Sequence, residues 1–132
     1  MTYHLQIVTP DGKCFDGQAV RLTVPTIHGQ VGILARHINY VTALGMGTAK
    51  VVTEDGERCA ACIGGMLAVT NGEVKVVATT FEWADEIDVA RAKASIARAE
   101  KMLENPSDDH TVQYANARIK RARVRLSTAE KK

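Results

Sequence analysis

Two rows of arginines are the residues of this chain best suited to bind an anion. Arg91 and Arg98 lie seven positions apart, and Arg118, Arg121 and Arg125 follow at spacings of three and four. On helices each row would occupy one face, and two facing rows would repel each other unless an anion lay between them. Because the guanidinium group offers paired donors at fixed geometry, phosphate suits it well. A plain solvated basic face is the alternative interpretation.

No motif in the sequence points to catalysis. We find no G-x-x-x-x-G-K-[ST] phosphate loop, no G-x-S-x-G nucleophile motif and no H-x-x-x-H or H-E-x-x-H metal motif. Cys59 and Cys62 form a C-x-x-C pair, but residues three apart on a strand point to opposite faces. We therefore expect free structural cysteines and neither a catalytic nor a metal site. A small enzyme that uses one of these thiols is an alternative, and it predicts rapid alkylation.

Length and composition are those of an ordinary globular protein. The chain has 132 residues, of which 45% are hydrophobic and 24% are charged. Its formal net charge of +2 is too small to imply a polyanionic partner by itself. Since no run of apolar residues is long enough for a transmembrane helix and the N-terminus lacks the pattern of a signal peptide, we expect a cytoplasmic protein. Any membrane association would then depend on a partner.

Residues 1–84 have the period-two pattern of β-strands. Val20, Leu22 and Val24 alternate with polar residues in one such run. Asp55-Gly56 and Asn71-Gly72 separate pairs of runs, and glycine accepts the positive φ that tight hairpin turns require. Arg58–Ile63 and Met66–Thr70 are read as two separate strands, on either side of Gly64-Gly65. Strands spaced about ten residues apart predict an antiparallel β-sandwich of two packed sheets.

From about residue 85 the pattern changes to that of α-helices. Asn105-Pro106-Ser107 interrupts it, because proline cannot continue a helix, and the short turn predicts an antiparallel two-helix hairpin over 85–132. Each helix carries one narrow apolar seam: Val89, Ala92, Ile96, Ala99 and Leu103, then Val112, Ala115, Ile119, Ala122 and Leu126.

The small alanines of these seams bury little area, so the stability of the hairpin should depend on what it docks against. This favours a two-state element, and permanent packing against the sandwich is the alternative.

Charge separates the two parts of the chain. Residues 1–85 contain six basic and eight acidic residues, a net charge of −2, whereas residues 86–132 contain eleven and seven, a net charge of +4. The basic second helix leaves a nucleic-acid-binding module as an alternative function, with salt-sensitive binding as its signature. Against that function, we expect no aromatic residue interleaved with the basic residues of the second helix, and the two phenylalanines, Phe15 and Phe81, lie outside it.

Three stretches resemble one known family. The segment from His28 to His37 with Thr42-Ala43-Leu44 resembles the signature of epsilon subunits of F-type ATP synthases. Gly64-Gly65-Met66-Leu67-Ala68-Val69 resembles the family's G-G-x-L-x-[IV] strand. Ile87-Asp88-Val89-Ala90-Arg91-Ala92 is similar to the I-D-x-x-R-A motif of its first C-terminal helix. The resemblance extends over essentially the whole chain.

The resemblance implies a β-sandwich of about ten strands followed by the helical hairpin. It implies a non-catalytic rotor subunit at the cytoplasmic face of the bacterial plasma membrane, whose sandwich binds the gamma subunit and the ring of c subunits. The hairpin can rise into the alpha and beta subunits and block ATP hydrolysis, or fold down against the sandwich. No nucleic acid, direct membrane insertion or required cofactor is expected.

In part of the family the folded hairpin binds ATP as a regulatory ligand. Carried over onto this sequence, the residues are Glu82, Ile87, Asp88, Arg91, Ala92, Arg98, Arg121 and Arg125. Asp88 is expected to contact the base or ribose, or to position Arg91. Gln30 and His37 are the expected contacts with the c ring. Gln30 stands where the family often has an acid, so a salt bridge there would be lost.

Overall fold

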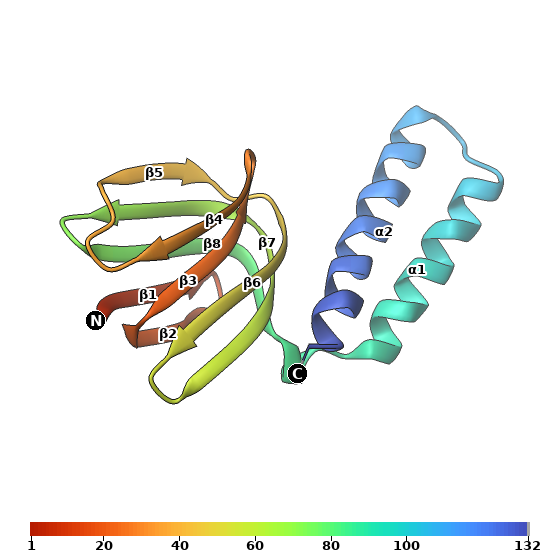
Figure 1. The fold of residues 1–132 in the computed structure, drawn as a ribbon. Coiled ribbons are helices and arrows are strands. Elements are labelled where there is room, and N and C mark those ends of the chain that lie inside the picture. Colours follow the sequence, from red (N-terminus) through yellow and green to blue (C-terminus); the bar gives the residue numbers. More distant parts are fainter. Residues whose placement is uncertain (132) are drawn as a thin grey trace.

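Eight β-strands precede two α-helices in the computed structural model, which describes residues 1–131 (Figure 1). The strands are β1 (Tyr3–Thr9), β2 (Gly12–Ala19), β3 (Arg21–Thr26), β4 (Gly29–Leu34), β5 (Tyr40–Ala43), β6 (Met46–Thr53), β7 (Gly56–Thr70) and β8 (Glu73–Trp83). A short 3-10 turn, η1 (Ala84–Glu86), leads into α1 (Val89–Glu104) and α2 (Asp109–Ala129).

The strands curl into two layers that enclose one apolar interior (Figure 1). They follow the order β2-β1-β8-β7-β6-β3-β4, and β5 pairs with β7 off this path. All pairings in the described chain are antiparallel except β1 with β8, which is parallel. Alternate side chains of several strands, such as Leu5 and Ile7 on β1, point into this interior and are buried. The predicted β-sandwich is therefore confirmed, with one parallel pair.

The structure has eight strands where about ten were expected, and the long strand β7 accounts for one of the two missing strands. Its 15 residues run without interruption, although the sequence suggested separate strands on either side of Gly64-Gly65. The first half of β7 pairs with β6 and the second half with β5, so one strand serves both layers. Gly64 and Gly65 have φ of +72° and +122°, which lets the strand bend at this crossing point.

A second difference concerns the run around Val20. Strand β2 ends at Ala19 and β3 begins at Arg21, so Val20 lies between two strands. Leu22 and Val24 are buried as predicted, whereas Val20 is half-buried. Apolar and polar residues continue to alternate across Val20, so periodicity alone predicted one strand where the structure has two.

The two helices form the predicted antiparallel hairpin (Figure 1). Each begins at an aspartate whose carboxylate caps it: Asp88 Oδ1 accepts from the backbone N–H of Arg91 at 3.0 Å, and Asp108 Oδ1 accepts from that of Thr111 at 2.8 Å. Hydrogen bonding to Thr111 lowers the pKa of Asp108.

The helices pack through a small cluster at mid-length. Ala99, Ala115 and Ile119 are its buried members, with Met102 and Leu103 packed against them. The alanine-rich seam thus brings the helices close while burying few large side chains.

The hairpin meets the sandwich at one end, formed by η1, the start of α1 and the last turns of α2, which we call the hinge end (Figure 1). Three residues that are cross-strand neighbours on β6, β7 and β8 lie beneath it: Thr48, Ala61 and Glu82. We call them the docking row. Each of the three contacts the hairpin, so one short line of sandwich residues supports it.

Two of these contacts are buried. The hydroxyls of Thr48 and Thr128 share a hydrogen bond of 2.7 Å, and Thr128 is fully buried. Ala61, also fully buried, packs in a cluster with Ile87 and Ala129. At roughly 25 cal/mol per Å2 of apolar surface, so small a cluster stabilises the docked position only modestly.

Candidate functional site

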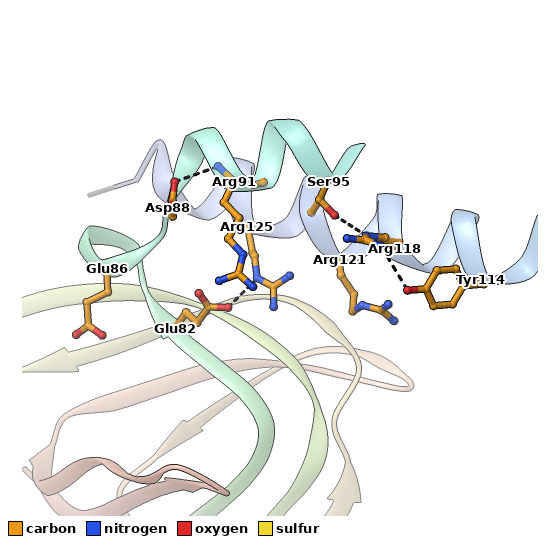
Figure 2. A pocket seen from close by; sticks show the side chains of 11 residues that line it. Glu82, Glu86, Asp88, Arg91, Ser95, Tyr114, Arg118, Arg121 and Arg125 are labelled. Carbon is orange, nitrogen blue, oxygen red and sulfur yellow. Dashed lines mark hydrogen bonds and ion pairs between the residues drawn. The ribbon is translucent and has the colours of Figure 1, made fainter. Parts of the chain in front are cut away.

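A cleft of about 450 Å3 opens where the hairpin faces the end of the sandwich (Figure 2). Volumes of this size are typical of small-molecule sites. Its wall comes from the end of β8, from η1 and from both helices: Glu82, Glu86, Asp88, Arg91, Ala92, Ser95, Tyr114, Arg118, Arg121, Ala122 and Arg125.

One ion pair joins the sandwich to α2 at the hinge end of the cleft. Arg125 Nε donates to Glu82 Oε1 at 2.7 Å. The two side chains are 30% and 35% exposed, so solvent screens the pair only in part. Glu82 is the third member of the docking row, and this contact therefore links the cleft to the docked position of the hairpin.

A second polar group lies farther from the hinge and bridges the two helices. Arg118 Nε donates to the hydroxyl of Ser95 at 2.8 Å, and its Nη1 donates to the hydroxyl of Tyr114 at 3.4 Å (Figure 2). These bonds hold the guanidinium of α2 against α1. A guanidinium has five N–H donors, so most of them stay available for an anion.

Arg91 and Arg121 are the remaining arginines of the cleft. Within residues 1–131 neither side chain has an ion pair or a side-chain hydrogen bond. Asp88 lies beside Arg91, but its carboxylate is engaged with the backbone N–H of that residue rather than with its guanidinium. The cleft thus contains two arginines with no carboxylate partner, beside Arg118 and Arg125, which use only some of their N–H donors. These positive charges and donors suit a polyanion such as a phosphate chain.

The cleft is polarised along its length (Figure 2). Its three carboxylates belong to Glu82, Glu86 and Asp88, which are all within seven residues at the hinge end. The arginines of α2 lead away from them toward Tyr114. A ligand with donors at one end and negative charge at the other would match this arrangement.

The structure brings six of the eight predicted ATP-site residues to this cleft: Glu82, Asp88, Arg91, Ala92, Arg121 and Arg125. Ile87 is instead buried against Ala61 and Ala129. Arg98 is exposed and outside the cleft, seven residues, or about 10 Å of helix, beyond Arg91.

Sequence reasoning missed Glu86, Ser95, Tyr114 and Ala122 as lining residues, and it did not assign Arg118 to the ATP site. The regular spacing of Arg118, Arg121 and Arg125 was a usable signal for the first of these arginines. The expectation that the basic helix carries no interleaved aromatic residue was wrong, because Tyr114 lies in α2 one helical turn before Arg118.

The two predicted c-ring residues lie at opposite ends of β4. Gln30 is exposed near the start of the strand, with the exposed Ile27 close by in sequence. His37 follows the end of β4, where its Nδ1 donates to the backbone carbonyl of Ile38 at 2.7 Å. Leu34 and Ile38 are exposed beside it, at 56% and 78%. His37 therefore lies next in sequence to the exposed Ile38, and Gln30 lies on an exposed part of β4.

Among residues 1–131, Cys14, Cys59 and Cys62 are free. Cys59 is half-buried, whereas Cys62 is buried and belongs to the main core. Burial raises the pKa of the Cys62 thiol to about 12, which disfavours the reactive thiolate. Among residues 1–131, no group of three or more His, Cys, Asp or Glu is arranged to hold a metal ion.

No helix in the described part of the chain is both long and apolar enough to cross a bilayer.

Both parts of the chain match family models of one rotary enzyme. Residues 2–84 match the β-sandwich domain of the ATP synthase delta/epsilon chain, and residues 85–130 match its long α-helix domain. The ATP synthase epsilon chains of Staphylococcus aureus strains JH9 and Newman are 40% identical to this chain over 132 residues. The alignment covers 99% of this chain and 98% of each relative.

Two solved structures share the fold. A chain of the Euglena gracilis mitochondrial ATP synthase, solved as an OSCP/F1/c-ring assembly, aligns with a TM-score of 0.71 at 22% identity, over 96% of this chain and 76% of that one. A chain of the Tetrahymena thermophila mitochondrial ATP synthase central stalk and c ring aligns with a TM-score of 0.61 at 16% identity, over 96% and 95%.

The sandwich, the hairpin and their order along the chain thus agree with family models that together cover nearly every residue, and the protein belongs to the ATP synthase epsilon chain family.

Proposed function

We propose that this chain is a non-catalytic central-stalk subunit of a proton-translocating F-type ATP synthase, which turns with the rotor and restrains ATP hydrolysis through its hairpin. Family membership supports the first part, as do the structural relatives, which are chains of an OSCP/F1/c-ring assembly and of a central stalk with its c ring. Catalysis belongs to other subunits. The protein works at the cytoplasmic face of the bacterial plasma membrane and is held there by its partners.

The sandwich offers exposed apolar surface for two rotor partners. Met66 and Val77 are direct cross-strand neighbours on β7 and β8 and are each 46% exposed. This pair suits the gamma subunit, since apolar patches on soluble proteins commonly mark interfaces. The ends of β4, with Gln30 and His37, suit the c ring. Because Gln30 is neutral, that contact depends on hydrogen bonding and apolar packing rather than on a salt bridge.

The small docking surface of the hairpin is the observation that carries the regulatory part. The hairpin is held at its hinge end by one hydroxyl pair, by the ion pairs Arg125–Glu82 and Arg58–Asp85, and by a small apolar cluster. The buried members of that cluster are Ala61, Ile87 and Ala129, and Val89 and Val124 pack against them. A partner surface of comparable size can compete with such contacts. When the hairpin rises, the arginines of α2 meet acidic surface on the alpha and beta subunits, an interaction that weakens with salt.

ATP is the regulatory ligand that best fits the cleft, and no cofactor is required for the rotor role. The cleft supplies arginines for phosphates and carboxylates for the hydroxyl and amino groups of a nucleoside. Since its wall includes Glu82 of the sandwich and residues of both helices, bound ATP stabilises the docked hairpin. High ATP therefore keeps the hairpin away from the catalytic subunits.

Removal of the hairpin tests the regulatory role. A variant that ends at residue 86 keeps every strand of the sandwich, so assembly and proton-coupled synthesis in the reconstituted enzyme should be retained. ATP hydrolysis should rise several-fold over the full-length enzyme, measured as phosphate release at equal subunit content. Equal hydrolysis by the truncated and full-length enzymes would contradict the inhibitory role but not the rotor role.

The nucleotide role is tested by calorimetric titration of the isolated chain with ATP. Saturable binding is expected, and Arg91→Ala should weaken it by about tenfold or more, because a charge-assisted hydrogen bond to phosphate is lost. Arg123→Ala is the matched control, since Arg123 is exposed and outside the cleft. No heat of binding at millimolar ATP would contradict this role, and an equal loss in both variants would remove Arg91 from the site.

A further inference from the structure

Arg118 differs from the other arginines of the cleft in two ways: hydrogen bonds hold its guanidinium in place, and no carboxylate neutralises its charge. Arg125 is paired with a carboxylate at 2.7 Å, whereas the partners of Arg118 are the neutral hydroxyls of Ser95 and Tyr114. Its side chain is half-buried between the helices. Two neutral hydrogen bonds hold the guanidinium in place without cancelling its charge, so little conformational freedom is lost when an anion binds.

The polarity of the cleft determines which end of a nucleotide would reach this residue. Glu82, Glu86 and Asp88 repel phosphate at the hinge end and offer acceptors to a nucleoside (Figure 2). The phosphate chain must then extend away from the hinge along α2. Arg125 and Arg118 are seven residues, or about 10 Å, apart on that helix. The last phosphate of the chain therefore lies nearest Arg118.

We infer that Arg118, which lies outside the residue set implied by family resemblance, binds the terminal phosphate of ATP and makes the cleft prefer ATP to ADP. Ser95 and Tyr114 are its positioning residues. Arg98, which the family resemblance included in the ATP site, is exposed and outside the cleft. The inference rests on the proposed nucleotide role of the cleft and adds the basis of its selectivity.

The test is a calorimetric titration of the full-length chain with ATP and with ADP, for the wild type and four variants. Arg118→Gln should weaken ATP binding by about tenfold or more and leave ADP binding within about twofold, so the ratio of the two affinities collapses. Arg98→Gln and the control Arg123→Gln remove the same charge outside the cleft and should preserve that ratio. Ser95→Ala should lower the ratio by a smaller factor, because the guanidinium keeps its charge but loses its strongest tether.

The outcomes separate the two proposals. Suppose that the wild type binds ATP. If Arg118→Gln then lowers the ATP and ADP affinities equally, or lowers neither of them, the role of Arg118 is overturned while the nucleotide role stands. The same holds if Arg98→Gln, rather than Arg118→Gln, abolishes the preference for ATP. If the wild type binds no ATP, both proposals are overturned. Unchanged far-ultraviolet circular dichroism and melting temperature exclude misfolding as the cause of a loss.

Discussion

Replacing Gly65 with alanine is expected to destabilise the protein by about 3–5 kcal/mol, a large share of the total stability of a domain of this size. A Cβ at this position would overlap the backbone carbonyl oxygen of Val77 and lie 2.7 Å from the Cα of Ala78. Both atoms belong to the backbone of β8, which cannot move without breaking the ladder that runs through both layers. The φ of +122° adds strain for any residue with a side chain.

The neighbouring glycine provides a matched control. Gly64→Ala also introduces a side chain at positive φ, but its Cβ would meet only the side chain of Thr79, at 3.4 Å. We expect a loss of about 1–2 kcal/mol from the left-handed conformation alone. Urea unfolding followed by the fluorescence of Trp83, the single tryptophan and a buried one, measures both. Equal losses of stability in the two variants would show that the close approach of β8 is not the reason why position 65 requires glycine.

Ala61→Glu is expected to detach the hairpin while leaving the sandwich folded. Ala61 is the fully buried centre of the docking row, and Glu82 is its direct cross-strand neighbour. A glutamate there would be an unpaired buried charge beside a second carboxylate, at a cost of about 3–5 kcal/mol. Release of the hairpin exposes the new carboxylate to water. Since the docked contact is small, release is the less costly response.

Two measurements follow the detached hairpin. Backbone amides of α2 should exchange with deuterium much faster than in the wild type, while those of β1, β7 and β8 stay protected. ATP affinity should fall by about tenfold or more, because Glu82 no longer faces α2 across the cleft. In the reconstituted enzyme the freed hairpin should inhibit ATP hydrolysis more strongly, which is the opposite of the effect of truncation.

A carboxylate at an exposed site is the control for charge alone. Thr79→Glu adds the same group to an exposed position of β8, and it should leave exchange of α2 and ATP affinity unchanged. Protection of α2 that survives Ala61→Glu would show that the hairpin docks through contacts other than the row.

Much of the fold was predictable because it depends on local patterns. Alternation and the Asp-Gly and Asn-Gly turns identified the β6–β7 and β7–β8 hairpins, and alternating spacings of three and four identified both helices. The expected break between strands at Gly64-Gly65 was wrong, since a pair of glycines is typical of a break and equally of a bend within one strand. Only the pairing of β7 with β6 on one side and β5 on the other distinguishes these cases.

The types of residue that form the candidate site were predictable, but which arginines of the two rows face the cleft was not. The residues alone indicated two arginine rows and a short turn that makes the helices antiparallel, and the family resemblance added Glu82 and Asp88. The axial offset of the helices depends on how Ala99, Ala115 and Ile119 pack, and a helical period carries no information about it. That offset brings Ser95 opposite Arg118 and leaves Arg98 outside the cleft. Tertiary packing thus decided which arginines face one ligand, because neighbours across two helices are set by contact and not by spacing.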